Sequence, residues 1–536
     1  MEFTLHARRA RQPGLAAARW LVPVLLTALL GGCGGGALPT TAPGAATGAG
    51  SSGAGASSQS TAAALCQNPR HGIDPVTQTA YPDQQGTLLD EQGWLSAWTS
   101  NTYLWYAEVP SGNPASYSSA TAWFDVLKTN ATTPSGRAKD RFHFSYTTAY
   151  WESLETSGAS AGYGLAWDLV AATPPRVVYV AYLEPALPAS TSAAALSRGT
   201  RVLSIDGAQV DYGDANILNA GLLPAAAGQQ HVFVVQDPGS SATRSVTLTA
   251  ATVTEAPVMN TTLLPGGTVG YLQFNDHLAT AEAALAGAIT QLKTAGATDL
   301  VLDMRYNGGG LLDIASELAY MIAGPASTSG RTFELLRFNA KHPTTDPVTL
   351  ATIVPTPFHA TALGYSLTTG QALPTLGLSR VFVLTGAATC SASESVINSL
   401  RGVGVQVIQI GSTTCGKPYG FYPTDNCGTT YFSIQFQGVN ALGFGNYPDG
   451  FVPQNGATGG IDAQAVLPGC SVGDDFSHAL GDPAEGRLAA ALQYLGNGSC
   501  PAPSGIAPQL AGAALPVAGT ALTIKHPFLQ NRIVLH

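Results

Sequence analysis

Hydrophobic and polar positions divide the chain after residue 86 into three patterns. From 87 to 106, leucine and aromatic residues recur at helical spacing, which predicts a small helical unit with an aromatic core. From about 160 to 252, short β-forming runs alternate with turn formers, which predicts a β-rich module. From 268 onward, strands alternate with helices, the pattern of βαβ units around a parallel sheet. We therefore expect an α/β core with an inserted β-rich domain and a small helical N-terminal unit.

The first 65 residues differ in composition from the rest of the chain. Four arginines precede an apolar run over 21–30 that is too short for a permanent membrane span, as in an export signal. The run ends in Leu30-Gly31-Gly32-Cys33, which resembles a bacterial lipobox with Cys33 as the lipidated residue; an ordinary signal peptide with an incidental cysteine is the alternative. Residues 34–65 are uncharged and rich in Gly, Ala, Ser and Thr, which indicates a tether. We expect an exported, lipid-anchored protein of the bacterial cell envelope.

Charge narrows the classes of partner. The chain has 24 Lys and Arg against 33 Asp and Glu, a formal net charge of −9, and charged residues make up only 11% of it. A run of Lys or Arg does not occur after residue 20, so the electrostatic footprint of nucleic-acid binding is missing. Nucleic acid is therefore not an expected partner.

Three segments of the α/β region contain residues that could take part in catalysis, and each follows a predicted strand. Residues 303–310 (DMRYNGGG) place glycines between a predicted strand and helix, where backbone N–H groups can bind an oxyanion or the loop merely turns the chain. Ser391 lies in CSASE (390–394) at a strand-to-helix turn, where a serine can cap the helix, act as a nucleophile, or both. Lys417 lies in the third segment, GSTTCGKP (411–418).

The third segment nearly matches a nucleotide-binding loop. Such a loop needs a hydroxyl after the lysine to hold Mg²⁺, and position 418 is Pro, so we reject that interpretation. A lysine acts as a base near neutral pH only if burial or positive neighbours lower its pKa. Lys417 lies in an otherwise uncharged stretch, 402–424, although a solvated surface position is the default for a lone loop lysine.

Together, the three segments resemble the carboxy-terminal processing (tail-specific) serine peptidases. In that family the pattern D-L-R-x-N-x-G-G supplies the oxyanion loop, S-A-S-E the nucleophile and G-K the general base. The first pattern is matched here by Asp303, Arg305, Asn307, Gly309 and Gly310. The resemblance implies a ClpP/crotonase-like core, a catalytic dyad of Ser391 and Lys417, and an oxyanion hole formed by the N–H groups of Gly309 and Ala392.

The resemblance extends into the β-rich module. Gly162-Tyr163-Gly164-Leu165 and residues 198–207 resemble the carboxylate loop and core strands of a PDZ domain. This implies that Gly162, Tyr163, Gly164 and Leu165 bind the apolar C-terminus of a protein substrate. The expected protein is a serine endopeptidase that cleaves proteins near their C-termini. The alternative is a non-catalytic envelope protein on the same fold that holds apolar ligands or protein tails.

The expected divisions of the chain follow from these patterns. They are a lipoprotein signal (1–33), a tether (34–65), a helical N-terminal unit (66–158), a PDZ-like domain (159–255), a serine peptidase core (256–470) and a C-terminal helix and tail (471–536).

The chain departs from the family pattern around the lysine. The family often has a glutamine four residues after the lysine to orient it, and this chain has Phe421 there. What orients Lys417 is therefore open, with Thr413, Thr414 and Tyr419 as candidates.

Other catalytic groups are less favoured. His277, His342 and His359 lie in no comparable motif, so each is expected to be a structural or surface residue. A metal-binding motif such as H-E-x-x-H is absent from the sequence, so neither a metal nor a cofactor is expected. Asp474-Asp475 has the pattern of a solvated turn.

Setting aside Cys33, six of the seven cysteines remain, and an even number in an exported chain favours disulfides. We predict that Cys415 pairs with Cys427, because the two flank a turn-rich loop that contains Lys417; buried free thiols are the alternative. The second predicted pair is Cys470 with Cys500. The partners of Cys66 and Cys390 stay open.

Overall fold

The structure is a computed structural model. It describes residues 63–157, 159–171, 174–185, 196–457, 460–502, 522, 525 and 532–534. The predicted signal, Cys33 and all but the end of the predicted tether lie outside these residues. The chain divides into two units, 1–52 and 53–536, and every described residue falls in the second. Among the described helices, none is both long and apolar enough to cross a membrane.

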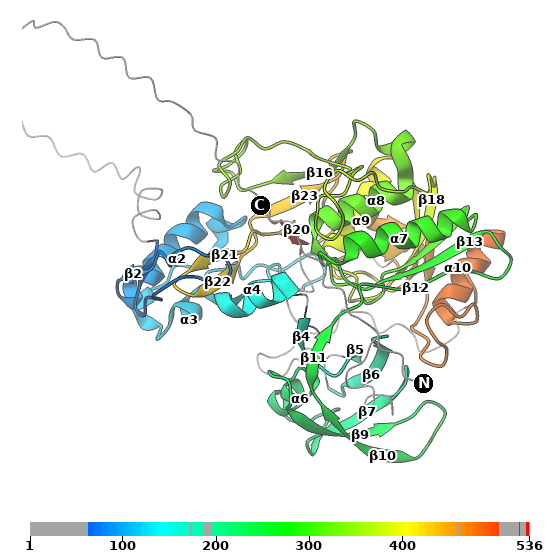
Figure 1. The fold of residues 1–536 in the computed structure, drawn as a ribbon, viewed down its shortest axis with the longest axis horizontal. Coiled ribbons are helices and arrows are strands. Elements are labelled where there is room, and N and C mark those ends of the chain that lie inside the picture. Colours follow the sequence, from blue (N-terminus) through cyan, green and yellow to red (C-terminus); the bar gives the residue numbers. More distant parts are fainter. Residues whose placement is uncertain are drawn as a thin grey trace, which may run out of the picture. The chain divides into compact units, whose positions relative to one another are not determined.

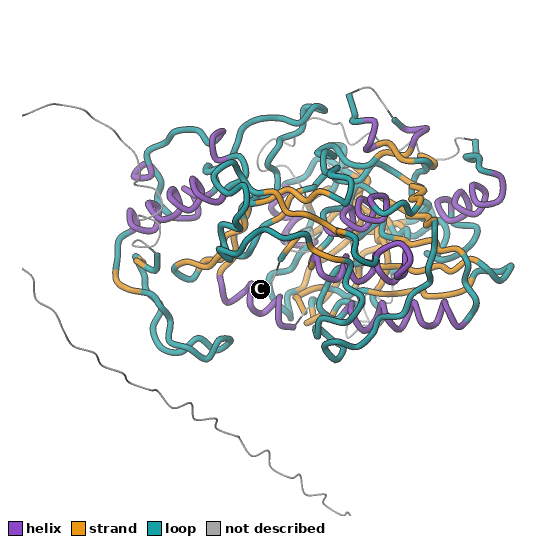
Figure 2. The backbone as a smooth tube through the Cα atoms, turned by 90° about the horizontal axis from the view of Figure 1, so that it is seen from above, coloured by secondary structure: helices purple, strands orange, loops and turns teal. Residues whose placement is uncertain are grey.

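The α/β region is built on a six-stranded sheet with the strand order β12-β13-β14-β18-β19-β26 (Figure 1). Its neighbouring strands are parallel except for β12, which runs antiparallel to β13. This confirms the predicted βαβ pattern. Figure 2 shows helices, in purple, lying alongside strands, in orange. The strands are β12 (Val258–Leu263), β13 (Val269–Phe274), β14 (Asp299–Asp303), β18 (Arg380–Thr385), β19 (Gln406–Gly411) and β26 (Gly469–Ser471).

Helices cover both faces of this sheet because its central strands are apolar on both sides. One face packs against three helices, with Leu302 and Val383 of the strands in the shared core. The other face, including Phe382 and Ile410, packs against α10 (Gly486–Asn497). The three helices of the first face are α7 (Ala281–Thr294), α8 (Leu312–Thr328) and α9 (Ala392–Gly402).

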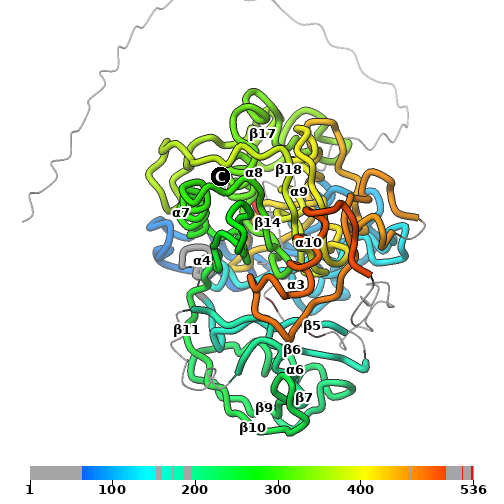
Figure 3. Tube along the Cα trace, turned by 90° about the vertical axis from the view of Figure 1, so that its right-hand side faces the viewer, coloured from blue at the N-terminus to red at the C-terminus, as the bar shows by residue number. Residues whose placement is uncertain are grey.

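The β-rich module forms a sheet of its own with the order β10-β9-β7-β6-β5, in which β8 also pairs with β7. Its neighbours are antiparallel, and Trp167, Phe233 and Leu218 lie in a separate hydrophobic core. Figure 3 shows these strands gathered around α6 (Ala215–Leu222). The strands are β5 (Leu165–Ala171), β6 (Val177–Leu183), β7 (Arg201–Ile205), β8 (Ala208–Gln209), β9 (Gln230–Gln236) and β10 (Thr243–Thr249). A short pair, β4 (Ala159–Gly162) with β11 (Ala251–Thr254), lies at its two ends in the sequence.

The N-terminal region contains the predicted helix, α2 (Leu88–Thr102), together with α3 (Ala120–Phe124) and α4 (Thr148–Ser157). Trp94 and Trp98 are buried and stack with ring centroids 5.5 Å apart. The region also contains strands, since β3 (Phe144–Thr147) pairs with β22 (Thr429–Phe432), which in turn pairs with β21 (Thr424–Asn426).

Smaller strands complete the described β-structure. A second sheet has the order β17-β16-β23-β20. It consists of β16 (Thr332–Arg337), β17 (Thr356–Pro357), β20 (Tyr419–Gly420) and β23 (Phe436–Val439). The other short pairs are β1 (Leu65–Cys66) with β2 (Gln84–Gln85), β24 (Val452–Pro453) with β25 (Val466–Leu467), and β15 (Gly310–Leu311) with β27 (Arg532–Ile533).

Three disulfides link the described residues, and they correct one predicted pairing. Cys470 is bonded to Cys500, as predicted. The predicted Cys415–Cys427 bond is wrong, because Cys415 is bonded to Cys390 and Cys427 to Cys66. Cys390 and Cys415 follow the adjacent parallel strands β18 and β19, so they meet at one edge of the sheet.

Candidate active site

The three predicted segments meet at the carboxyl ends of β14, β18 and β19, which are neighbours in the sheet. The carbonyl of Asn307 in the glycine loop accepts hydrogen bonds from the Cys390 N–H (3.0 Å) and the Ser393 hydroxyl (3.1 Å). The Cys415 N–H donates to the carbonyl of Thr389 at 2.9 Å. The loop, the serine turn and the lysine segment are therefore held together by direct contacts.

Ser391 occupies the N-cap position of α9 in a conformation that few non-glycine residues adopt. Its φ is 59° and its ψ is −112°, and the residue is fully buried. Such strained backbone is found where the surrounding structure fixes it, often at functional sites. The turn thus resembles a nucleophile elbow, in which strand, sharp turn and helix set the serine at the start of the helix.

The Glu394 carboxylate accepts hydrogen bonds from both the serine turn and the lysine segment, a role that sequence reasoning missed. Its Oε2 accepts the backbone N–H of Ser391 (2.9 Å) and of Lys417 (2.8 Å). Its Oε1 accepts the Thr414 hydroxyl (2.5 Å) and the Gly416 N–H (2.8 Å). The carboxylate is fully buried, so four donors satisfy it without water. One side chain therefore fixes the backbone of both dyad candidates.

Lys417 is fully buried against aromatic rings, not at the surface. Its Nζ lies 4.7 Å from the ring centroid of Phe142 and 4.6 Å from that of Phe421. Phe421 stands where the family often has glutamine, so a ring replaces the amide here. The Thr414 hydroxyl, one of the candidates to orient the lysine, donates to Glu394.

Two arginines of the N-terminal region hold the backbone next to Lys417. Arg137 donates to the carbonyl of Cys415 at 3.1 Å, and Arg141 donates to the carbonyls of Cys415 and Gly416. Burial, followed by the charge of Arg137, lowers the pKa of Arg141 to about 10. The lysine loop therefore lies beside two partly buried arginines that the sequence did not connect with it.

The glycine loop is braced by Asn307 and His277. The Gly309 N–H donates to Asn307 Oδ1 at 2.9 Å, and His277 Nδ1 lies 3.0 Å from the same oxygen. His277 is fully buried, and burial lowers its pKa to about 3, so it is neutral at pH 7. An amide oxygen only accepts, so His277 donates from Nδ1. The predicted oxyanion donor Gly309 is thus engaged with Asn307 in this structure.

The other two histidines considered, His342 and His359, contact residues outside these loops. His342 Nε2 lies 2.9 Å from Asn101 Oδ1, and His359 Nε2 lies 3.4 Å from Asp313 Oδ1.

The Asp-Met-Arg part of the loop belongs to a buried ion cluster. Arg305 binds Asp303 and pairs with Asp474 (2.8 Å) and Glu485 (2.7 Å). Arg198 of the β-rich module also pairs with Asp474, at 2.7 Å. The predicted solvated turn at Asp474 is therefore wrong: its side chain is only 8% exposed. Burial acts to raise the pKa of Asp474, but the nearby guanidinium groups outweigh it and hold that pKa far below its ordinary value.

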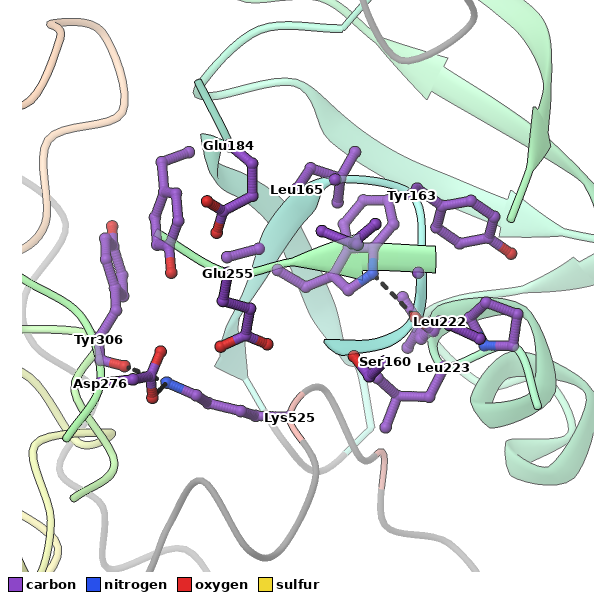
Figure 4. A pocket seen from close by; sticks show the side chains of 18 of the residues that line it. Ser160, Tyr163, Leu165, Glu184, Leu222, Leu223, Glu255, Asp276, Tyr306 and Lys525 are labelled. Atoms are coloured by element: carbon purple, nitrogen blue, oxygen red, sulfur yellow. Dashed lines mark hydrogen bonds and ion pairs between the residues drawn. The ribbon is translucent and has the colours of Figure 1, made fainter. Parts of the chain in front are cut away.

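Residues Gly162, Tyr163, Gly164 and Leu165 line an open pocket (Figure 4). The pocket also contains residues of the α/β region, among them Asp276 and Tyr306. Two more acids, Glu184 and Glu255, lie on its wall. The pocket that the predicted carboxylate loop lines is thus also lined by several carboxyl groups.

Cys390, Glu394 and Cys415 lie close enough together to suggest a metal site. Their chemistry does not fit one, because both sulfur atoms are joined in a disulfide and the carboxylate is satisfied by four donors.

The sequence of this region matches that of known peptidases. Residues 268–421, which include Ser391 and Lys417, match the family model of Peptidase family S41. A carboxyl-terminal-processing protease of Picosynechococcus sp. is 30% identical over 173 residues, which is 31% of this chain and 39% of that protein. A chloroplastic C-terminal processing peptidase of Tetradesmus obliquus is 32% identical over 179 residues, which is 31% of this chain and 38% of that protein. The chain thus spans about two fifths of the length of these relatives.

The fold is similar to that of a solved structure. A crystal structure from Bacteroides fragilis that is described as an S41 protease superposes with a TM-score of 0.54 and 22% sequence identity. The match covers 78% of this chain and 98% of that one. The core is therefore similar in sequence to S41 peptidases, and most of the chain shares the fold of one such structure.

Proposed function

We propose that the protein is a serine endopeptidase that cleaves exported proteins near their C-termini, with Ser391 as nucleophile and Lys417 as general base. The observation that carries the proposal is the shared carboxylate of Glu394, which accepts the backbone N–H of both residues. The Cys390–Cys415 disulfide joins the residue before Ser391 to the lysine loop. Together these contacts hold the backbones of the two residues in one frame, which supports a shared role in nucleophilic catalysis.

In the proposed reaction, Ser391 Oγ attacks the carbonyl carbon of the scissile peptide while its proton passes to the neutral Lys417 amine. The C–N bond then breaks, and the lysine returns the proton to the leaving amine. Water, deprotonated by the same lysine, attacks the acyl-enzyme ester and releases Ser391 and a new C-terminal carboxylate. The proposal therefore requires the buried Lys417 amine to be neutral when the serine attacks.

The tetrahedral oxygen would be bound by the N–H groups of Gly309 and Ala392. Because the Gly309 N–H now donates to Asn307, the loop must exchange that hydrogen bond for one to the substrate. In the same proposal, the β-rich module is a PDZ-like domain that captures a substrate tail by strand addition near Gly162 to Leu165. Three disulfides among the described residues support an oxidising compartment, and lipidation at Cys33 would hold the enzyme at the membrane.

The test is a cleavage assay of the full chain on protein substrates with free apolar, charged or amidated C-termini. Ser391→Ala and Lys417→Ala should each lower the rate at least about 10³-fold, and both together no further, because the pair acts as one unit. Lys293→Ala, an exposed lysine on α7, serves as the matched control. Tail binding without Ser391-dependent cleavage would favour the binding-protein alternative.

A further inference from the structure

The two peptide groups that precede Lys417 are held at both ends by charged side chains. In the first group, 415–416, the carbonyl accepts a hydrogen bond from Arg141 and the N–H donates to Glu394 at 2.8 Å. In the second group, 416–417, the carbonyl accepts from Arg141 at 3.3 Å and the N–H donates to Glu394 at 2.8 Å. A carboxylate therefore binds the N–H side of both groups, and a guanidinium binds their carbonyl side.

These contacts set the direction in which the Lys417 side chain leaves the backbone. A planar peptide group that is bound at its N–H and at its carbonyl cannot turn without breaking one of the two hydrogen bonds. Gly416 leaves no room for adjustment, because its φ is 84° and a Cβ there would lie 2.3 Å from the Pro448 carbonyl oxygen. Arg141 also donates to that carbonyl, at 3.4 Å. One guanidinium thus binds three carbonyls around the lysine loop.

The arginines beside this loop are not used for charge pairing. Within the part of the chain that the structure describes, neither Arg137 nor Arg141 forms an ion pair, and both donate to main-chain carbonyls. The low pKa of Arg141, about 10, comes first from burial, so nearby carboxylates do not make up for the lost hydration. Taking a cation out of water without an anionic partner costs stability. Stability alone therefore does not favour an arginine here, whereas a fork of N–H donors fits several carbonyls at once.

The segment that carries the two arginines, 133–142, is tied to the lysine loop at both of its ends. At the first end, the Thr133 hydroxyl donates to Asp449 at 2.6 Å. At the other end, the ring centroid of Phe142 lies 4.7 Å from Lys417 Nζ. A segment of the N-terminal region therefore contacts both the backbone and the side chain of the proposed base.

We propose that Arg141 is a positioning residue of the general base. Its guanidinium fixes the carbonyl side of the two peptide groups whose N–H side Glu394 fixes, and Arg137 supports the first of them. The inference rests on the proposed function for the role of Lys417. It goes beyond that function because it assigns the placement of the lysine to a residue outside the predicted peptidase core, 256–470.

The first test compares arginine variants of the full chain by steady-state cleavage of one protein substrate. Arg141→Ala should lower kcat about 10- to 100-fold and leave KM within about 3-fold of wild type, because a misplaced catalytic group slows the reaction without weakening binding. Arg137→Ala removes one hydrogen bond and should lower kcat by only about 3- to 10-fold. Arg331→Ala, at an exposed arginine before β16, is the matched control and should leave kcat unchanged.

Two further variants separate geometry from charge. Arg141→Lys keeps the positive charge but replaces the fork of donors by a single ammonium group, so kcat should stay at least about 3-fold below wild type. Full activity of this variant would show that charge alone suffices and would overturn the proposal. Arg141→Ala combined with Glu394→Gln should lose less than the product of the two separate losses, because both residues act on the same peptide groups. Losses that simply multiply would contradict a shared role.

Hydrogen exchange of backbone amides gives a readout that needs no catalysis. A peptide covering 412–420 should exchange at least about 10-fold faster in Arg141→Ala than in wild type, whereas peptides from α8 should exchange as in wild type. If Arg141→Ala does not fold, Arg137→Ala carries both measurements with the smaller effect. Unchanged kcat, a change confined to KM, or unchanged exchange of 412–420 would overturn the proposal. If wild type shows no Ser391-dependent cleavage while the exchange result holds, the proposed function fails and Arg141 is still the residue that holds this loop.

Discussion

Glu394 accepts the backbone N–H of Lys417 at 2.8 Å with the same oxygen that accepts the N–H of Ser391. This carboxylate does not touch the atoms that would react, so it is a positioning residue. It couples the capping of α9 to the placement of the lysine loop, and the strained φ of Ser391 is tolerated because several contacts fix it.

Glu394→Gln should therefore impair catalysis through geometry. Glutamine offers one oxygen and one NH₂ group in place of two oxygens, so at least one pair of buried donors loses its acceptor, at about 1 to 3 kcal/mol for each donor. We expect kcat to fall on the order of 10- to 100-fold with KM nearly unchanged, and the melting temperature to drop. Steady-state kinetics and thermal unfolding, with exposed Asp125→Asn as control, measure both. A change confined to KM would contradict a positioning role.

Two of the disulfides allow a bond beside the dyad to be compared with a bond elsewhere in the same molecule. The Cys390–Cys415 bond lies beside the dyad and joins residues 25 positions apart in the sequence. The Cys66–Cys427 bond lies away from the dyad and joins residues 361 positions apart. Chain entropy assigns about 3 to 4 kcal/mol to the shorter loop and about 5 to 6 kcal/mol to the longer one. Replacing Cys390 and Cys415 by Ala should mainly lower kcat, and replacing Cys66 and Cys427 should mainly lower stability. Equal loss of kcat in both pairs would show that the first bond has no special role in the site.

Sequence periodicity predicted the α/β core because each element shows its own spacing of apolar residues. The meeting of Ser391 with the lysine and glycine loops was also predictable, since the carboxyl ends of parallel strands share one edge. The same argument, applied to Cys390 and Cys415, would have given the correct disulfide, but closeness in sequence favoured Cys427 instead.

Other contacts leave no such signal in the sequence. The carbonyls that Arg137 and Arg141 bind lie more than 270 positions further along the chain. The CSASE segment predicted a serine that can cap the helix, but the binding of Glu394 to a distant loop is visible only when that loop is in place.

The glycine loop offers a test of the oxyanion hole. Gly309 has a φ of 108°, a conformation that side chains disfavour, and its N–H donates to Asn307. Gly309→Val should displace this donor and lower kcat by roughly 10²-fold or more, as loss of an oxyanion donor does in other hydrolases. Gly287→Ala on an open face of α7 is the matched glycine control. If the valine variant kept the kcat of wild type, the loop would serve only as a turn of the chain.

Glu317 of α8 makes a prediction about pH. Burial, followed by the charge of Glu282, raises its pKa to about 8. A carboxyl whose pKa is higher in the folded than in the unfolded state binds an extra proton on folding between about pH 4.5 and 8. Its contribution to stability is therefore complete below about pH 4.5 and is lost as the pH rises through 8.

Glu317→Gln keeps the shape of the protonated acid but does not titrate. The melting temperature of the variant relative to wild type should therefore rise from pH 5 to about pH 8 and level off above it, because over this range only wild type gives up a proton on unfolding. Thermal unfolding in buffers of matched ionic strength measures this difference, and exposed Asp125→Asn should show no comparable trend. A difference that stays constant over this range, or falls with rising pH, would mean that Glu317 is already ionised in the folded protein at pH 5.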